Sequence, residues 1–366
     1  MKFVICGDFV SQDPKRIQVD QRLLNLLKCA DYVAVNFEAP VRGVGITIYK
    51  SGPALTQSLD SPAFIENLGA NIIMLANNHM MDQDKEGCET SIRAFKEDTL
   101  IIGAGDFKDA YNLRVVEKDG IKVGLLCLVH KEFGALGLDS KSSDYGTAWI
   151  NHPLVNKTIL NAKKECDLLI VLPHAGVEDV VVPLPEWRAR YKEFIDMGAD
   201  TVIASHPHTP QGWEEYNGKK IFYSLGNFFF QLFSNQHGEN WYKGLIVEMD
   251  IDEDMQLSFE VHNTRFSETS LELDESTECK LYNDYLCELL NEEDKYWEYL
   301  NTTLKSLWIE YKLYLLRGLG AVAPTTDMHI LSHAVYGLLK GPDIPMMLNN
   351  FQCESHRWAI ERMLRM

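Results

Sequence analysis

Residues 198–230 read GADTVIASHPHTPQGWEEYNGKKIFYSLGNFFF and carry the pattern that decides the fold. Two short apolar runs lie within this stretch, DTVIAS (200–205) and KIFYSL (220–225), and polar or glycine residues bound both of them. Runs of this length, rich in Val, Ile and aromatic residues, are typical of strands buried on both faces of a sheet. The triplet HPH (206–208) follows the first run directly. We therefore expect two imidazoles at the end of a buried strand.

The same kind of apolar run recurs through most of the chain. The other expected strands are KFVIC (2–6), YVAVN (32–36), NIIML (71–75), LIIG (100–103), KVGLLCLV (122–129), DLLIVL (167–172) and GLIVEMD (244–250). Helical patterns separate several of them. DSPAFIENLG (60–69) begins with capping residues and a proline, and PEWRARYKEFIDMG (185–198) ends at a glycine, as helices do. Strands that alternate with helices indicate an α/β domain.

The C-terminal quarter of the chain has a different composition. Residues 270–317 are rich in Glu, Leu, Tyr and Trp at helical spacing, and no strand signal is seen in them. Residues 327–340 and 349–365 also look helical. We predict one domain over residues 1–268 and an all-helical C-terminal extension over residues 269–366. The apolar side chains of the extension suggest a face that packs on the domain or forms a homo-oligomer.

Charge and composition narrow the range of partners. The chain has 35 Lys and Arg against 53 Asp and Glu, a formal net charge of -18, which argues against nucleic acid or an anionic membrane as partner. An anionic small-molecule or polymer substrate would need bound cations to reverse this field locally. We see no secretory signal and no apolar run of about 18 residues. The eight cysteines form no C-x-x-C pair, so reduced thiols in a cytoplasmic protein are expected.

Polar side chains follow five of the expected strands. They are Asp8; Asn36 and Glu38; Asn77, Asn78 and His79, with Asp82 three residues on; His174; and His206 and His208. Each of these alone is more often a cap, turn or loop residue. Together they favour a metal centre, because a two-metal site needs oxygen and imidazole donors that converge on ions about 3.5–4 Å apart. Gly7 would let the backbone turn tightly before Asp8. Ligands without thiolate favour one or two divalent ions of Mn, Fe or Zn.

Several longer motifs resemble those of one known family. The stretches GDFV, VNFEAPV, LANNHMMDQ, IIGAG, LPHAGVE and residues 198–230 cover about residues 1–265. They resemble the capsule and poly-γ-glutamate biosynthesis protein CapA family, a branch of the calcineurin-like metallophosphoesterase superfamily. The resemblance implies a metallophosphoesterase-like β-sandwich flanked by helices, in four αββα layers. The helical extension lies beyond it.

The resemblance also implies a role for each polar residue. Asp8 and His208 would bind a first metal, Glu38 would bridge, and Asn78, His174 and His206 would bind a second. His79 would serve as a general acid or hydrogen-bond donor to the transition state, and Asp82 would orient it. Two motifs depart from the wider superfamily. Where the superfamily has Asp-x-His, this chain has Asp8-Phe9-Val10, and where the superfamily has Gly-Asp it has Asn36-Phe37-Glu38. The first site therefore has one imidazole fewer and should be the weaker one.

Three further residues are weaker candidates for contact with the substrate. Lys50 lies in YKSGPAL and Glu178 in HAGVE, and His130 follows the strand expected at 122–129. For His130 an ordinary loop position is the commoner interpretation. Asn227 is expected to brace the loop that carries the two histidines of HPH.

The function predicted from these residues and the resemblance is that of a metal-dependent hydrolase, phosphoesterase-like in chemistry, in the biosynthesis of capsule, poly-γ-glutamate or another surface polymer. Two alternatives use the same fold. One is an amide hydrolase or transferase acting on a γ-glutamyl polymer. The other is a non-catalytic subunit that binds polymer or an assembly partner.

Overall fold

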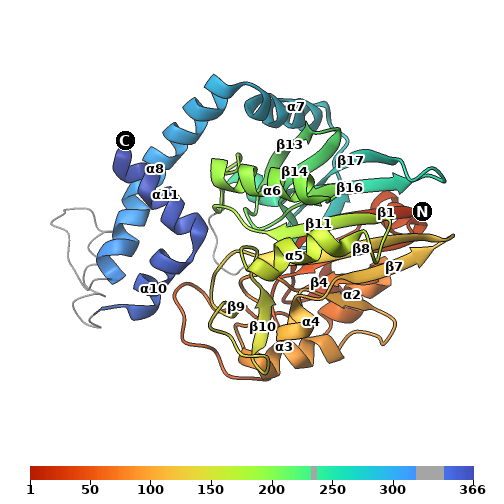
Figure 1. Ribbon diagram of the computed structural model, residues 1–366, viewed down its shortest axis with the longest axis horizontal. Helices are drawn as coiled ribbons and strands as arrows, with labels where there is room; N and C mark the ends of the chain where they lie inside the picture. Colours follow the sequence, from red (N-terminus) through yellow and green to blue (C-terminus); the bar gives the residue numbers. More distant parts are fainter. Residues whose placement is uncertain (232–236, 319–341) are drawn as a thin grey trace.

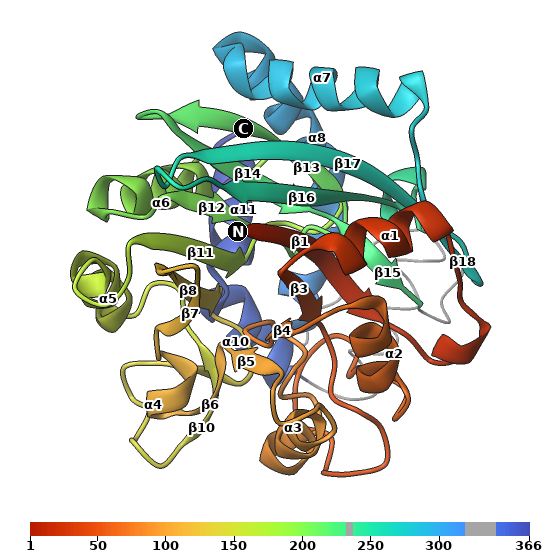
Figure 2. The same ribbon diagram turned by 90° about the vertical axis from the view of Figure 1, so that its right-hand side faces the viewer.

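The computed structural model describes residues 1–231, 237–318 and 342–366, and most of its strands belong to two sheets (Figures 1 and 2). The larger sheet contains β1 (Lys2–Val10), β2 (Gln18–Val19), β3 (Tyr32–Phe37), β4 (Ile72–Met74), β5 (Leu100–Ile102), β15 (Asn227–Phe230), β16 (Lys243–Ile251), β17 (Leu257–Phe266) and β18 (Ser270–Leu273). The smaller contains β7 (Arg114–Lys118), β8 (Ile121–Val129), β11 (Leu168–His174), β12 (Thr201–Ile203), β13 (Pro210–Tyr216) and β14 (Lys219–Leu225). A separate small sheet joins β6 (Ala104–Asp106), β9 (Ala135–Leu136) and β10 (Tyr145–Ala148).

The order of the strands places parallel strands at the centre of both large sheets. The larger runs β2-β18-β17-β16-β1-β3-β4-β5, with β15 also paired to β1, and the smaller runs β13-β14-β12-β11-β8-β7. β1, β3 and β4 are mutually parallel, as are β8, β11 and β12. Each of the nine strands expected from sequence has a counterpart. β1 and β11 run longer than predicted, so Asp8 and His174 lie inside strands and not after them.

The two sheets pack face to face and carry helices on their outer faces. Side chains alternate along β1: Phe3 and Ile5 lie in the core between the sheets, whereas Val4 and Cys6 lie in the core beneath the outer helices. Helices α1 (Gln21–Cys29), α2 (Ser61–Leu68) and α3 (Asp84–Arg93) pack on the larger sheet, and α5 (Pro153–Ala162) and α6 (Pro185–Met197) on the smaller. The predicted four-layer αββα sandwich is confirmed.

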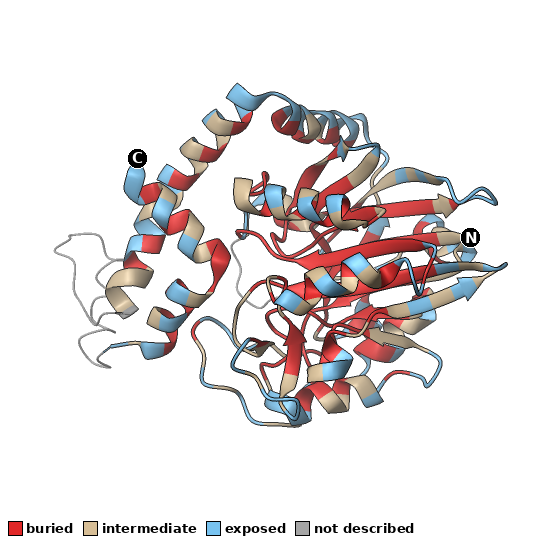
Figure 3. Cartoon of the chain, viewed as in Figure 1, coloured by how far each residue is buried: buried red, intermediate tan, exposed pale blue. Residues whose placement is uncertain are grey.

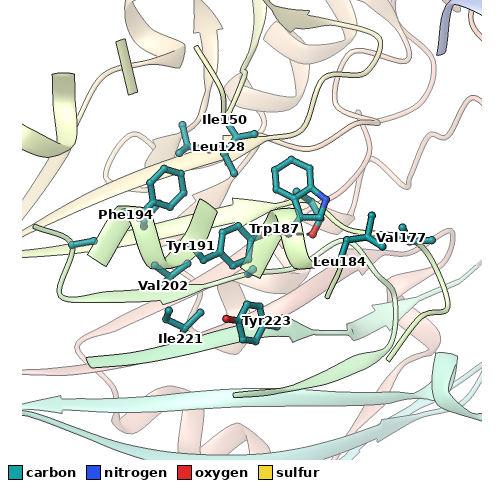
Figure 4. Close-up of a cluster of buried hydrophobic side chains, with 14 of the residues drawn as sticks. Leu128, Ile150, Val177, Leu184, Trp187, Tyr191, Phe194, Val202, Ile221 and Tyr223 are labelled. Carbon is teal, nitrogen blue, oxygen red and sulfur yellow. Dashed lines mark hydrogen bonds between the residues drawn. The ribbon is translucent and has the colours of Figure 1, made fainter. Parts of the chain in front are cut away.

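Aromatic residues of α6 anchor the outer core of the smaller sheet (Figure 4). Trp187 and Tyr191 are each 1% exposed, and the Tyr191 ring stacks on that of Tyr223 in β14 at 5.8 Å. α6 ends at Gly198, whose φ of 120° provides the left-handed turn expected from sequence. Figure 3 shows the resulting pattern, with buried strands inside and exposed positions along the outer helices.

The C-terminal helices lie along one side of this sandwich. They are α7 (Thr277–Asn291), α8 (Glu293–Gly318), α10 (Ile344–Gln352) and α11 (Glu354–Arg365). The helix expected at 327–340 lies outside the described residues. The expectation that no strand follows residue 268 is wrong, because β18 pairs with β17 and β2. A four-residue strand is too short to show a clear alternation in sequence. None of the helices within the described ranges is both long and apolar enough to cross a membrane.

The helical extension is packed on the sandwich and does not stand apart from it. Leu286, Leu300 and Leu304 are fully buried in the same core as α6. The Tyr296 hydroxyl donates a hydrogen bond to the Pro183 carbonyl over 2.8 Å. Figure 1 shows α8, α10 and α11 at the end of the sandwich opposite the N-terminus. The carboxyl ends of the parallel strands therefore face the extension.

One buried carboxylate holds α11 against the sandwich. Glu354 is 3% exposed and accepts hydrogen bonds from the Lys131 main-chain N–H at 2.7 Å, Trp149 Nε1 at 2.7 Å and Asn151 Nδ2 at 3.1 Å. The adjacent Ser355 contacts His130 and Trp187 through its hydroxyl. These contacts join residues more than 160 positions apart in sequence.

Replacing Glu354 with Ala should therefore destabilise the protein. Three donors would lose their acceptor, and unsatisfied buried groups cost about 1–3 kcal/mol each, so we expect a loss of about 3 kcal/mol or more in the free energy of unfolding. Urea denaturation measures it. The control is Glu361→Ala on the same helix, whose side chain is 54% exposed and which should change stability by less than about 0.5 kcal/mol. Equal effects of the two variants would contradict the proposed anchoring.

Candidate metal centre

The candidate site lies where the carboxyl ends of both large sheets meet. Three of its residues come from the parallel strands of the larger sheet and three from those of the smaller. They are Asp8 in β1, Glu38 after β3, Asn78 after β4, His174 at the end of β11, and His206 and His208 after β12. All six are at most 4% exposed. The structure thus brings together the complete set of ligands predicted from sequence, and their role as ligands stays a prediction.

The first group of donor atoms surrounds His174. Its Nε2 lies 3.0 Å from Asn78 Oδ1, 3.1 Å from His206 Nδ1 and 3.3 Å from Glu38 Oε1. Ligands bound to one metal at about 2.0–2.2 Å are separated by about 3.0–3.5 Å. The group therefore has the spacing of donors that converge on one ion.

The second group shares Glu38 with the first. His208 Nε2 lies 3.6 Å from Glu38 Oε1, and His208 Nδ1 lies 3.4 Å from Asp8 Oδ2. Asp8, Glu38 and His208 thus form one potential metal-binding group, and Glu38, His174 and His206 form another. A carboxylate that belongs to both groups could serve as a ligand in each of them.

Two observations within the described residues test whether a metal fits here. Glu38 Oε1 is buried without a hydrogen-bond partner, and a buried carboxylate oxygen in that state is satisfied by a cation or by a proton. The facing nitrogens of His174 and His206, 3.1 Å apart, can share at most one proton, and the His174 nitrogen also lies close to oxygens of Asn78 and Glu38. Imidazole, carboxylate and amide donors without a thiolate match Mn, Fe or Zn. The residues present therefore fit a divalent metal centre.

Local backbone strain supports the geometry of this site. His206 and His208 have φ values of 101° and 56°, which non-glycine residues rarely adopt, and Pro207 lies between them. Strain of this kind costs about 1–3 kcal/mol per residue and concentrates at functional sites. Gly7 has a different role from the one expected. A Cβ added at this position would lie 1.9 Å from the Gly226 carbonyl oxygen. Glycine is therefore required because the chain at Gly226, between β14 and β15, passes close to β1, and not because the backbone turns tightly.

Burial and charge separate the pKa values of the imidazoles. Burial lowers the pKa of His174 to about 3 and lowers that of His206 as well. Burial would also lower the pKa of His208, but the charge on Glu38 and the hydrogen bond with Asp8 outweigh it and raise the pKa to about 10. Burial, together with the charge on Asp8, raises the pKa of Glu38. His174 and His206 are therefore neutral and able to donate a lone pair, while His208 holds a proton in the absence of metal.

Asparagines brace the ligands, as outer partners usually do in metal sites. Asn36 Nδ2 donates to Asp8 Oδ1 at 2.6 Å, and Asn77 Nδ2 donates to Asn36 Oδ1 at 3.0 Å. Asn227 Oδ1 lies 2.9 Å from His208 Nδ1, and its Nδ2 donates to the His208 carbonyl. The bracing contact expected of Asn227 is therefore present.

His79 and Asp82 lie together beside the centre. His79 Nδ1 is 2.6 Å from Asp82 Oδ2, and Lys50 Nζ is 2.5 Å from Asp82 Oδ1. Burial raises the pKa of Asp82, but the charges and hydrogen bonds of His79 and Lys50 outweigh it and hold that pKa below its usual value. An ionised Asp82 that accepts from Nδ1 leaves Nε2 of His79 as the nitrogen that can serve a substrate.

A cavity of about 470 Å³ opens over the centre. Lys50, Asn78, His79, Glu178, His206 and His208 line it. His130 does not line it: its side chain is fully buried behind His206, with ring centroids 4.4 Å apart.

The far wall of the cavity comes from the helical extension. Its residues there include Leu307, Glu310, Tyr311, Tyr314, Asn349 and His356. Sequence reasoning missed all of them, because the extension carries no motif and lies outside the resemblance. Glu132 and Asp179 also line the cavity and were not singled out. The positive φ of Asp179, 60°, is visible only in the structure.

Comparison with known proteins agrees with the predicted family. A family described as bacterial capsule synthesis protein PGA_cap matches residues 5–232. The capsule biosynthesis protein CapA of Bacillus anthracis is 35% identical over 213 residues, which are 56% of this chain and 51% of that protein. The PGA biosynthesis protein CapA of Bacillus subtilis (strain 168) is 31% identical, over 56% of this chain and 54% of that one. The chain thus spans about half the length of the curated relatives it matches.

Among solved structures, a hypothetical protein from Thermus thermophilus is similar with a TM-score of 0.46 and 15% identity. The similarity covers 71% of this chain and 98% of that chain. The architecture is therefore assigned from the strands and helices of this chain alone.

The number of bound ions that each variant loses should depend on whether the replaced residue belongs to one group of donors or to both. We expect His174→Ala to lose the ion of its own group, His208→Ala to lose the other, and Glu38→Ala to lose both, because it belongs to each. Elemental analysis of protein purified without chelator measures this. His152→Ala is the matched control, since that histidine caps α5 by accepting from the Leu154 main-chain N–H at 3.1 Å, belongs to no group of potential ligands among the described residues and should leave metal content unchanged. A Glu38→Ala protein with full metal content would rule out the bridging position.

Metal binding should also release a proton. His208 has a pKa of about 10 in the absence of metal, so it is protonated at neutral pH and must lose that proton to act as a ligand. Affinity should therefore rise by about tenfold per pH unit for each proton released, up to the pKa of His208. Chelator competition at several pH values measures this, and His208→Asn should flatten the slope. An affinity of the wild-type protein that does not change between neutral pH and about pH 9 would contradict the prediction.

Proposed function

Because this chain belongs to the family of bacterial capsule synthesis proteins, we propose that it is a metal-dependent hydrolase with phosphoesterase-like chemistry. We place its activity in the biosynthesis of capsule, poly-γ-glutamate or another surface polymer. The observation that carries the proposal is the shared position of Glu38. It joins two groups of buried donors, within a centre whose His79, His206 and His208 line an open cavity. A purely structural metal site would be closed to solvent.

The chemistry that such a centre would supply is well defined. A bound divalent ion lowers the pKa of water to about 7 and neutralises the charge on a phosphoryl oxygen. The residues of this chain hold the donors in place before substrate arrives, since Asn36, Asn77 and Asn227 brace them through hydrogen bonds. Preorganised charge of this kind is usually the largest contribution to catalysis.

His79 is positioned to act as the general acid. Asp82 orients its ring through Nδ1. Lys50 Nζ donates a hydrogen bond to the other carboxylate oxygen of Asp82. Protonated His79 can then donate from Nε2 to the oxygen of the leaving group. His79 is no metal ligand in this proposal, because its neighbour Asn78 already contacts His174 in the first group of donors.

The two ends of the cavity differ in the groups that they offer to substrate. The end beside the ligands suits an anionic group once cations are bound. The opposite wall offers Tyr311 and Tyr314 together with the carboxylate of Glu310, which suit an organic part with hydroxyl or amino groups. We therefore propose an anionic ester as substrate, from a small molecule or a polymer end.

A substrate screen with metal-loaded protein tests the proposal as a whole. We expect turnover of phosphodiesters or phosphomonoesters. Release of amine from γ-glutamyl peptides without release of phosphate would instead favour an amide hydrolase or transferase. Full metal content without turnover of any of these substrates would favour a non-catalytic subunit.

The sharpest test separates His79 from His174. His79→Ala should keep its metal content and lower turnover by about 10²–10⁴, the usual contribution of a general acid. The loss should shrink for esters with good leaving groups, which need little protonation. His174→Ala should lose metal and activity together. Equal metal loss in both variants would show that the roles are wrongly assigned, and an unchanged rate in His79→Ala would exclude this residue from the chemistry.

A further inference from the structure

A second group of potential ligands lies where the sandwich meets the helical extension. His130 follows β8, Glu132 lies two residues further on, and Cys353 directly precedes α11. One donor atom of each lies within 4.8 Å of the others. His130 and Cys353 are fully buried, and the Glu132 side chain is 11% exposed. Cys353 lies outside residues 5–232, the part of the chain that matches the family.

The buried ring of His130 has one nitrogen that its surroundings leave unsatisfied. Nδ1 lies 2.9 Å from Ser355 Oγ, which also accepts a hydrogen bond from Trp187 Nε1 at 2.9 Å. A hydroxyl oxygen has two lone pairs, so Ser355 can accept from both. Nε2 has no hydrogen-bond partner within the described ranges.

A carboxylate oxygen, which is an acceptor, lies near this nitrogen. Nε2 of His130 lies 3.5 Å from Glu132 Oε1. When Ser355 accepts from Nδ1, Nε2 presents a lone pair to a carboxylate, and two acceptors cannot form a hydrogen bond with each other. A cation between them would satisfy both atoms.

The thiol of Cys353 completes the group. Cys353 Sγ lies 4.0 Å from His130 Nδ1, the nitrogen that faces Ser355, and contacts the side chain of Glu132, and one donor atom of each of the three residues lies within 4.8 Å of the others. A tetrahedral ion with bonds of about 2.0–2.3 Å separates its ligand atoms by about 3.3–3.7 Å. The 3.5 Å between Nε2 and Oε1 falls in this range. Glu132 also lines the cavity, which gives a fourth position access to water.

We propose that His130, Glu132 and Cys353 bind Zn²⁺ at the junction between the sandwich and the extension. A thiolate together with an imidazole and a carboxylate selects Zn²⁺ over Mn²⁺ or Mg²⁺. Ser355, through its contact with Nδ1, fixes the His130 ring that would hold the ion. This site shares no residue with the six ligands of the candidate centre, so it does not depend on the proposed hydrolase function.

Cobalt substitution gives a test that reports this site alone. A thiolate bound to Co²⁺ produces an intense sulfur-to-metal charge-transfer absorption in the near ultraviolet, whereas imidazole, carboxylate and amide ligands do not. The candidate centre holds no thiolate among its six predicted ligands. We expect the full-length protein, stripped of metal and reloaded with Co²⁺, to show this absorption. It should also bind one ion more than Cys353→Ser does.

Two further variants complete the experiment. Cys279→Ser removes another buried thiol of the extension and should keep both the absorption and the ion. Glu132→Gln should keep the thiol but weaken Zn²⁺ binding at this site by at least about tenfold. The proposal is overturned if the wild-type protein lacks the absorption, a result that needs no variant to fold. It is equally overturned if the absorption survives Cys353→Ser.

Discussion

The burial of two carboxylates at one point between the sheets is the constraint on which the rest of the site depends. Asp8 and Glu38 are both fully buried, and the ion pairs that the structure gives them within the described ranges are all with histidines. Buried charges are costly unless other charges and hydrogen bonds compensate them. Asn36 and, before any metal binds, the protonated His208 meet that requirement; in our proposal two metal ions take the place of that proton. The same buried charge provides the affinity of the site for cations.

Each sheet of the sandwich supplies three of the six candidate ligands, so neither sheet alone could form the site. The larger sheet delivers Asp8, Glu38 and Asn78 from adjacent parallel strands, and the smaller delivers the three histidines. The core between the sheets, with Phe3 and Ile5 among its buried residues, fixes the distance between the two sets. Strain at the HPH triplet can persist only because this packing over-determines it.

The helical extension forms one wall of the cavity over the candidate centre. The six candidate ligands lie within the part of the chain that matches the family, whereas the far wall of the cavity comes from α8, α10 and α11. Glu354 and Ser355 hold this wall in position through contacts that cross most of the sequence. In the proposed function, the chemistry therefore depends on the matched domain, and the choice of substrate depends largely on the extension.

The sequence by itself predicted nine of the strands among the described residues, several of the helices and the candidate ligands, because apolar periodicity, capping residues and motifs such as HPH are local properties of the chain. It did not determine which sheet each strand joins. Apolar runs alone indicate buried strands, and the sandwich was expected only from the resemblance. Only the tertiary structure decided that Gly7 is required by the Gly226 carbonyl, and that His130 faces Ser355 and not the cavity. These outcomes depend on contacts between segments as much as 225 residues apart, which no local pattern records.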